Sequence, residues 1–419
     1  MQKRKIGALI VGVNGATANT TIVGTILHNK GLIPDDSFKR GMITEDDCLK
    51  EHDLIDQTQI VFGGWDMIDK NAYEAAIDNR VLDRVVINSV KEELKKIRPM
   101  KALHTPHDVD ETIASDYSKN GTSLQRRVDH LREEIASFKE NNGLDGVVVI
   151  YLASPLKAQG TGVYNTLEEF RKAIRDNDTG LTSGMLYAYA AIEENCPFVD
   201  FTPNVTLETG ALLELADINN VPLAGRDGNT GQTLMKTVLG QMLKIRNLKL
   251  DGWYSTNILG NNDGKVLARS EHAEIKMRDK LGVLEPLLGY GDFDHTVNIE
   301  YFAPRGDNKE AWDSIDFLGW LDQSISVKIN WLGRDSILAA PLILDLIRLT
   351  EYAQRKGEKG IQSQLAMYFK NPLETEARGF YDQYKLFVDY YKPTAKVTCL
   401  PQNVEEVKHV DNPCAVVSG

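Results

Sequence analysis

Four lysines lie beside turns in the second half of the chain, and their ammonium groups could carry out acid–base chemistry. Lys276 and Lys280 are four residues apart in HAEIKMRDK, so a helix would place them on one face. Lys309 lies in RGDNKEAW, and Lys370 lies in YFKNPL. Gathered in one pocket, ammonium groups bind a phosphate dianion, and repulsion with desolvation lowers the pKa of a lysine toward the range for proton transfer. Taken singly, each lysine is more typical of a solvated surface.

Side-chain amides precede the first lysine pair. Asn261, Asn262 and Asp263 stand between two glycines in STNILGNNDGKVLARS. A polar, glycine-flanked stretch after an apolar run is typical of a strand that ends in a solvated loop. The alternative is that these side chains line a site for a polar ligand.

A glycine-containing turn near the start of the chain is a candidate dinucleotide loop. Gly12 and Gly15 lie between an expected strand and an expected helix, where glycines allow a pyrophosphate to approach the helix N-terminus. Asn14 and Thr17 replace the later glycines of a GxGxxG pattern, so a plain strand-to-helix turn is the alternative. Asp66, at the end of QIVFGGWD, would accept hydrogen bonds from the adenosine ribose and repel a 2′-phosphate, which favours NAD over NADP.

A second turn of the same kind occurs in LAGRDGNTGQTLMKTVL. Asp227, Thr230 and Gly231 precede the expected helix. Small hydroxyl and glycine residues at a helix start can hold a phosphate through backbone amides. An ordinary helix cap by Asn229 or Thr230 is the alternative.

The elements that must position these residues follow two patterns. Up to about residue 245, continuous apolar runs such as IGALIVGV and LDGVVVIYLA alternate with helical segments, which predicts a doubly wound parallel sheet covered by helices on both faces. The later runs LKLDGWYSTNIL, HTVNIEYFAP and ISVKINWL are more polar and predict an α+β unit with one exposed or partner-covered face. DSILAAPLILDLIRLTEYAQRKG predicts a buried helix that ends at a glycine.

The composition excludes several classes of protein. A chain of 419 residues predicts two or three domains, and a formal charge of −12 opposes a general role on nucleic acid or an anionic membrane. No apolar stretch reaches the roughly twenty residues that span a bilayer. Neither disulfides nor a metal site are predicted, so a cytoplasmic protein is expected. The four cysteines show no paired or CxxC spacing: Cys48, Cys196, Cys399 and Cys414. His104 and His107 have a spacing that occurs in metal sites, but no further ligands accompany them.

Several motifs resemble those of the inositol-3-phosphate synthase (myo-inositol-1-phosphate synthase) family. YSTNILGNNDGKVL is similar to SYxHLGNNDGxNL, GRDGNTGQTLMKTVL to GDDxKSGQTKxKSVL, and RGDNKEAWDSI to xGDSKxAMDEY. RDSILAAPLILDL is similar to EDSLLAxPxIxDL, and YFKNPL to LKAPL. The matches keep their order from residue 11 to about residue 373. The chain departs from the family where GVNGATANT replaces GWGGNNGST, YLASPLK replaces WTANTER and HAEIKMRDK replaces RSKEISKS.

The resemblance implies a redox-neutral cyclisation of D-glucose 6-phosphate to 1D-myo-inositol 3-phosphate with bound NAD. C5 is oxidised, C6 loses a proton, C6 closes onto C1, and the C5 ketone is reduced. Alkoxide and enolate charges develop in these steps, and ammonium groups are able to stabilise or protonate them. The family also implies a homotetramer and a Rossmann-type doubly wound sheet with an inserted α+β catalytic and oligomerisation domain. The expected units are residues 1–232, 233–338 and 339–419, the last returning to the NAD-binding domain before a C-terminal tail.

The resemblance also implies a role for each matched residue. Proton transfer and oxyanion stabilisation fall to Lys276 and Lys370, and phosphate or enolate binding falls to Lys280 and Lys309. Asp227 and Asp335 would orient lysines or substrate hydroxyls. The expected contacts of the substrate are Thr230, Gly231 and Asn261, together with Lys280 and Lys309. The expected contacts of NAD are Gly12, Asn14, Gly15, Asp66, Ala153, Ser154, Asp227, Asn262 and Asp263.

Two other functions use the same features. An NAD-dependent sugar-phosphate dehydrogenase that releases NADH would need the glycine turn and a phosphate site, but hydride transfer alone requires one base rather than several lysines. A catalytically silent NAD-binding regulator would keep the fold, because fold does not determine activity. The presence of all four lysines favours the cyclase.

Overall fold

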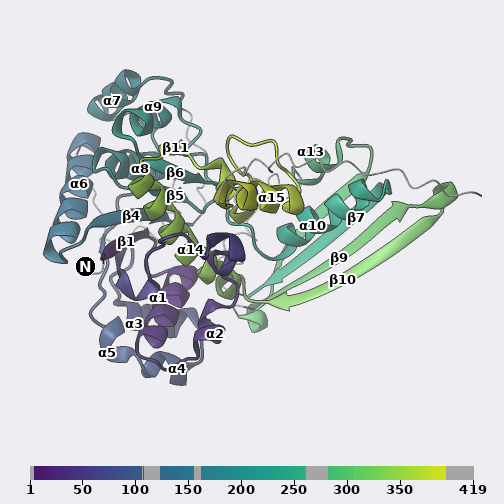
Figure 1. Cartoon of the computed structure of the whole chain (residues 1–419), viewed down its shortest axis with the longest axis horizontal. Helices are drawn as coiled ribbons and strands as arrows, with labels where there is room; N and C mark the ends of the chain where they lie inside the picture. Colours follow the sequence, from purple (N-terminus) through teal and green to yellow (C-terminus); the bar gives the residue numbers. More distant parts are fainter. Residues whose placement is uncertain are drawn as a thin grey trace, which may run out of the picture.

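Two β-sheets organise the chain. The computed structural model describes residues 4–105, 107, 123–154, 162–260, 282–306 and 308–392. The larger sheet has seven strands in the order β11-β6-β5-β4-β1-β2-β3, and the smaller sheet has four in the order β10-β9-β7-β8. Figure 1 shows the smaller sheet extending away from the larger one, with α10 along one of its faces.

The seven-stranded sheet is parallel throughout and buried on both faces. Its strands are β1 (Ile6–Val11), β2 (Ile60–Asp66), β3 (Met100–Lys101), β4 (Gly146–Tyr151), β5 (Phe198–Asp200), β6 (Pro222–Gly225) and β11 (Gly360–Ile361). Alternate residues of β1 enter different cores, because Ile6, Ala8 and Ile10 face one side and Leu9 and Val11 face the other. Continuous apolar runs are the expected sequence of such strands. The predicted doubly wound fold is therefore confirmed.

Helices cover the two faces of this sheet. One face packs against α1 (Ala16–Asn29), α3 (Ala72–Asn79), α14 (Asp335–Lys356) and α15 (Phe380–Tyr391). The other packs against α6 (Leu124–Asn141), α7 (Leu167–Asp176), α8 (Ser183–Glu193) and α9 (Gly210–Asn219). The short helices α2 (Asp35–Lys39), α4 (Arg84–Asn88) and α5 (Lys91–Leu94) lie between β1 and β3 in sequence. No helix of the described segments combines the length and apolarity that a membrane span needs.

The four-stranded sheet is mixed. It contains β7 (Lys249–Leu259), β8 (Asp294–Tyr301), β9 (Lys309–Leu318) and β10 (Ser324–Gly333), with β7 parallel to β8 and antiparallel to β9. Helices α10 (Gly231–Ile245) and α13 (Leu284–Leu288) cover one face, where Leu243, Leu250 and Phe317 are buried. The chain then enters α14 and adds β11 beside β6 of the first sheet. The division into units at residues 232 and 338 remains a prediction.

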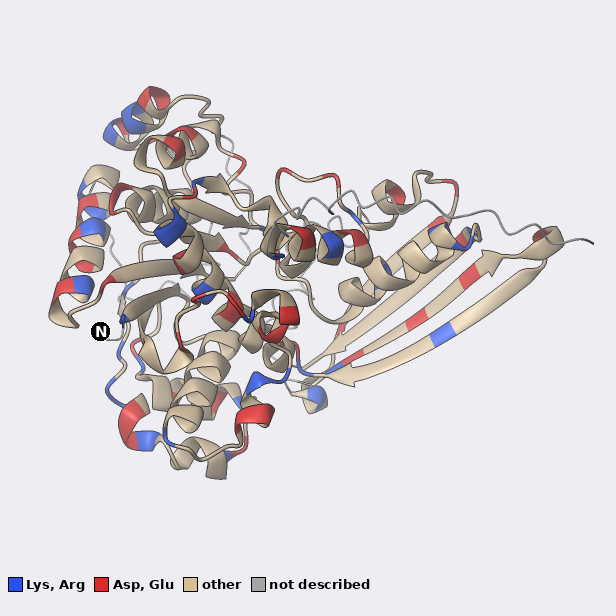
Figure 2. Cartoon of the chain, in the orientation of Figure 1, with Lys and Arg blue, Asp and Glu red and all other residues tan. Residues whose placement is uncertain are grey.

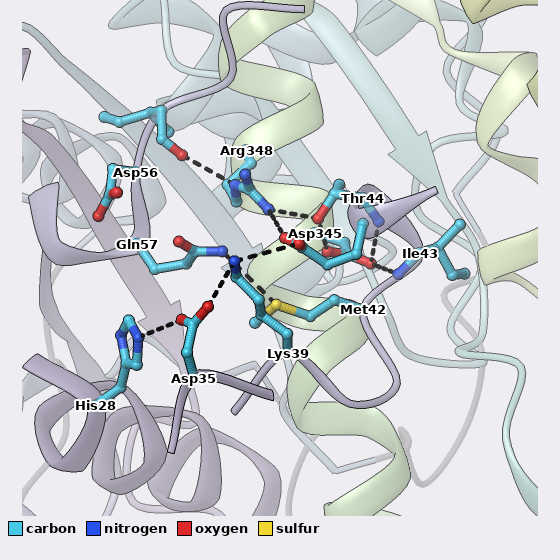
Figure 3. Close-up of polar contacts among 12 residues, drawn as sticks. His28, Asp35, Lys39, Met42, Ile43, Thr44, Asp56, Gln57, Asp345 and Arg348 are labelled. Carbon is cyan, nitrogen blue, oxygen red and sulfur yellow. Dashed lines mark hydrogen bonds and ion pairs between the residues drawn. The ribbon is translucent and has the colours of Figure 1, made fainter. Parts of the chain in front are cut away.

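A buried carboxylate ties α14 to the segment between α2 and β2 (Figure 3). Asp345 accepts hydrogen bonds from the backbone N–H of Ile43 at 2.5 Å, from the hydroxyl of Thr44, and from the Tyr368 hydroxyl at 3.3 Å. Arg348, one turn later, donates to the carbonyl of Ile55 and to the Thr44 hydroxyl. Burial raises the pKa of the Asp345 carboxyl to about 6, against 3.8 for a free aspartate. These contacts fix the helix whose first residue is Asp335.

The raised pKa of Asp345 predicts a pH dependence of stability. The folded state holds the Asp345 proton more tightly than the unfolded state between about pH 4 and pH 6. The free energy of unfolding should therefore decrease as the pH rises through this window, by roughly 3 kcal/mol in total. Asp345→Asn should remove this decrease in urea unfolding curves, whereas substitution of the exposed Asp322 by Asn should retain it. Equal pH profiles for the Asp345→Asn variant and the wild type would contradict this assignment.

Candidate active site

The first glycine turn joins the carboxyl ends of three strands of the large sheet. Gly12 follows β1 with φ +88°, and its N–H donates to the Trp65 carbonyl at 2.8 Å. A Cβ atom on Gly12 would lie 3.2 Å from the carbonyl oxygen of Leu152. Gly15 is the N-cap of α1 and provides no side-chain cap. The turn therefore leaves a backbone-lined approach to a helix N-terminus, which suits a pyrophosphate.

Asp66 braces this turn from the end of β2. Its Oδ2 accepts from the backbone N–H of Asn14 at 2.9 Å, and its Oδ1 accepts from the N–H of Ile68 at 3.0 Å. The Asn14 side chain donates to the carbonyls of Ile68 and Lys70 at 3.0 and 2.9 Å. Burial raises the pKa of Asp66, and the hydrogen bonds that it accepts from backbone N–H groups oppose this increase. The structure thus brings Asp66 to the glycine turn although it lies 51 residues after Gly15 and 54 residues after Gly12 in the sequence.

The two residues predicted on the nicotinamide side follow β4 and lie at the same edge. The Cα of Ala153 is 3.4 Å from the position that a Cβ on Gly12 would take. Ser154 comes next and is exposed. β4 is the neighbour of β1 on the side away from β2, so the turn lies where the strand order reverses. Ligands of open α/β sheets bind at this position.

The second turn carries a buried ion pair. Asp227 has φ +61° and is buried, and its N–H donates to the Thr202 carbonyl at 2.9 Å. Its Oδ1 accepts from the Lys370 ammonium at 2.8 Å, and the Lys370 N–H donates to the Asp227 carbonyl at 2.6 Å. Backbone and side chain together therefore fix the ammonium group of Lys370 beside the turn.

A second lysine–carboxylate pair lies against Gly231. Lys309 begins β9, Asp335 begins α14, and their Nζ and Oδ2 atoms are 2.7 Å apart. Gly231 has φ +58°, and a Cβ there would lie 2.9 Å from Asp335 Oδ1. Thr230 is the N-cap of α10, but its hydroxyl makes no capping hydrogen bond. The turn before α10 is thus open to an anion and has a cation within reach.

A polar network that sequence reasoning missed lies behind this turn. Gln232 Nε2 donates to Asp313 Oδ2 at 2.9 Å, and Gln232 Oε1 accepts from Asn257 Nδ2 at 2.7 Å. Trp253 Nε1 and Ser255 Oγ each donate to Asp313 Oδ1 at 2.7 Å. The sequence signal is the alternation of β7, because residues 253, 255 and 257 share the buried face and two of them are polar.

Lys236 was also missed, and it lies deeper in the same core. It is one helical turn after Gln232, is fully buried, and has its Nζ 2.7 Å from His295 Nε2. Burial lowers the pKa of Lys236 to about 8, while the negative charge of Asp313 acts to raise it. Its position between α10 and the sheet indicates a role in the core.

Some predicted residues cannot be placed in this arrangement. Lys276, Lys280, Asn261, Asn262 and Asp263 lie outside the described residues, as do Cys399 and Cys414. Within the described part of the chain, no group of three or more His, Cys, Asp or Glu side chains could hold a metal ion.

Sequence and structural comparisons relate the chain to known proteins. The family described as myo-inositol-1-phosphate synthase matches residues 6–391. Inositol-3-phosphate synthase 1 of Bacteroides thetaiotaomicron is 42% identical over 389 residues, covering 88% of this chain and 90% of that protein. Inositol-3-phosphate synthase of Trypanosoma brucei brucei is 33% identical over 318 residues, covering 72% of this chain and 60% of that protein.

Two crystal structures share the fold. Inositol-3-phosphate synthase from Caenorhabditis elegans superposes with a TM-score of 0.84 at 24% identity, covering 93% of this chain and 86% of that chain. A myo-inositol-1-phosphate synthase-related protein from Thermotoga maritima gives a TM-score of 0.76 at 24% identity, covering 93% and 100%. At this identity the likeness establishes the architecture alone.

Proposed function

The chain belongs to the myo-inositol-1-phosphate synthase family, and we propose on this premise that it converts D-glucose 6-phosphate into 1D-myo-inositol 3-phosphate. The observation that carries the proposal is the meeting of two lysine–carboxylate pairs, Lys370–Asp227 and Lys309–Asp335, at the turn before α10. A phosphate anchored at this turn would place the sugar carbons beside two ammonium groups. Oxidation, enolisation and aldol closure each develop charge on oxygen that such groups stabilise.

NAD is the cofactor of this family, and the first turn fits it. When bound, NAD would supply the hydride acceptor for C5 of the sugar and, after ring closure, the hydride donor for the same carbon. Gly12 and Gly15 would admit the pyrophosphate to the N-terminus of α1, where a Cβ on Gly12 would crowd the Leu152 carbonyl. Asp66 would accept from the ribose hydroxyls while it holds the backbone of Asn14. Ala153 and Ser154 would border the nicotinamide.

The remaining roles follow the family motifs. Lys370 would exchange a proton with the reacting oxygens, and Asp227 would orient its ammonium group. Lys309, oriented by Asp335, would bind the phosphate together with Thr230 and Gly231. The residues that lie outside the described ones keep their predicted roles: Lys276 in proton transfer, Lys280 in anion binding, and Asn261, Asn262 and Asp263 along the nicotinamide and sugar.

The uncovered face of the four-stranded sheet supports a homotetramer, which we also propose. Tyr254, Trp312 and Leu332 are 49%, 50% and 65% exposed on the face away from α10. β10 carries one charged residue, Lys328, within ten residues (Figure 2). Large apolar side chains on a sheet whose edge strand is sparsely charged are typical of a subunit interface. The free thiols of Cys48 and Cys196 support the cytoplasmic location predicted from the sequence.

The cyclase is distinguished from a dehydrogenase by the fate of the hydride. Incubation with NAD⁺ and glucose 6-phosphate deuterated at C5 should give an inositol phosphate that retains the label, as read by mass spectrometry. No bulk NADH should accumulate, because the same cofactor returns the hydride. NADP⁺ should support less product than NAD⁺, since Asp66 would face the 2′-phosphate. Stoichiometric NADH release would instead identify a dehydrogenase.

Two substitutions of Lys370 separate proton transfer from ion pairing. Lys370→Ala should lower turnover by at least about 10²-fold, the usual size of an acid–base or oxyanion effect. Lys370→Arg should keep the pairing with Asp227 and lose a comparable factor, because a guanidinium does not release its proton. Lys359→Ala is the matched control, since Lys359 pairs with Asp217 and is 46% exposed. Near-normal turnover of Lys370→Arg, measured by inositol phosphate release, would assign Lys370 to ion pairing only.

The proposed interface predicts a change in assembly. Trp312→Arg should shift the mass in light scattering from that of four chains toward smaller species, because a charge would be buried in the interface. Tyr381→Arg changes an aromatic residue of α15 that is 62% exposed and should leave the mass unchanged. A wild-type protein with the mass of one chain would show that the sheet face does not form the interface.

A further inference from the structure

In the network behind the second turn, the Asp313 carboxylate determines which group of each side chain donates and which accepts a hydrogen bond. An aspartate carboxylate only accepts hydrogen bonds, and the indole N–H of Trp253 only donates. Gln232 must therefore turn its NH₂ group toward Asp313 and its carbonyl toward Asn257, at 2.9 and 2.7 Å. Asn257 donates to that carbonyl through its own NH₂ group. The side-chain carbonyl oxygen of Asn257 is therefore the free end of this series of hydrogen-bonded amides.

That free end has no partner in the described protein. The Asn257 side chain is fully buried, and its Oδ1 makes no hydrogen bond with any described residue. Buried polar atoms are paired in most proteins, and an unpaired one destabilises the fold. A buried acceptor without a partner is therefore suited to a donor that arrives with a ligand.

The free end lies beside the proposed substrate site. Gln232 directly follows Gly231, which packs against the ion pair of Asp335 and Lys309. Asn257 contacts the Gln232 side chain from β7. The hydrogen-bonded side chains of Asp313, Gln232 and Asn257 therefore lie directly behind the residue that ends the phosphate turn.

The two possible directions would select different groups. A phosphate dianion offers only acceptors, so an NH₂ group would suit it, whereas a sugar hydroxyl is able to donate to a carbonyl oxygen. Packing α10 onto the sheet would be served equally well by either direction, since the same atoms are in contact. The carboxylate of Asp313 therefore determines that Asn257 presents its side-chain carbonyl to a ligand rather than its NH₂ group.

We propose that Asp313 is a positioning residue that fixes the direction of the Gln232–Asn257 amide chain, so that Asn257 presents a carbonyl acceptor to a hydroxyl of the bound sugar phosphate. This inference rests on the proposed function. It concerns the polyol part of the substrate and leaves phosphate recognition to Thr230, Gly231 and Lys309.

Two isosteric substitutions test the direction. Asp313→Asn keeps an oxygen for Trp253 and Ser255 but sets an NH₂ group against Gln232, which reverses the chain and turns the NH₂ of Asn257 toward the ligand. Asn257→Asp alone sets an acceptor against the Gln232 carbonyl. Each single variant should bind glucose 6-phosphate at least about tenfold more weakly in calorimetry with NADH in place of NAD⁺, because NADH cannot accept the C5 hydride and the sugar phosphate is not turned over.

The double variant Asp313→Asn/Asn257→Asp should recover most of the affinity at unchanged net charge. In the reversed chain, Gln232 would donate to the new carboxylate, whose second oxygen would again face the ligand as an acceptor. If Asp313 had only a structural role, the losses of binding free energy in the two single variants would add in the double variant. Affinity for inorganic phosphate should change less than about twofold in all three variants, since the phosphate turn keeps its contacts.

The control is the same change on the opposite face of the same strand. Asp316→Asn lies on β9, where Asp316 contacts the Ser326 hydroxyl, and should leave binding unchanged. Wild-type affinity in Asp313→Asn, or no recovery in a folded double variant, would overturn the proposal. Because binding is measured without turnover, an inactive wild-type protein that still binds the sugar phosphate would contradict the proposed function and not this result.

Discussion

The contact between Gly231 and the Lys309–Asp335 ion pair joins the two sheets at the candidate site. Gly231 ends the turn that leaves β6 and begins α10, Lys309 begins β9, and Asp335 begins α14. A Cβ at Gly231 would meet the Asp335 carboxylate at 2.9 Å, so the close approach requires glycine. Three segments from different parts of the chain are thereby held within the reach of one phosphate group. The turn at Gly12, which we propose for the cofactor, occupies the same carboxyl edge of the large sheet.

The charge balance at this junction explains why several lysines are needed. The chain carries a formal charge of −12, which repels a phosphorylated substrate at long range. Lys309 and Lys370 are each paired with an aspartate, so the two pairs orient ammonium groups without adding net positive charge. Further cations are required to balance a bound dianion. Lys276 and Lys280, predicted from the sequence motif, remain the proposed source of that charge.

The sequence allowed the large sheet to be predicted better than the small one. Continuous apolar runs such as IGALIVGV and LDGVVVIYLA predicted β1 and β4, because strands buried on both faces need little polarity. The short strands β5 and β11 have three and two residues, too few for a pattern. β9 was not predicted as a strand, because Asp313 occupies an inward position where the alternation requires an apolar residue. The strand, turn and helix around Gly12 were predictable from the glycine spacing, whereas the contact of Asp66 with this turn depends on the pairing of β1 with β2.

The interruption of the β9 pattern has a physical meaning, because polarity increases along the small sheet toward the site. The paired inward positions are Leu250 with Phe317, then Trp253 with Ile315, then Ser255 with Asp313, and Lys309 begins β9 beyond them. On α10 the facing residues change in the same direction, from Leu243 through Lys236 to Gln232. Apolar residues at these positions would pack without the cost of desolvating a carboxylate. A core that served stability alone would not need that cost. The buried polar residues are confined to the end of the small sheet nearest Gly231, which connects the network to the candidate site.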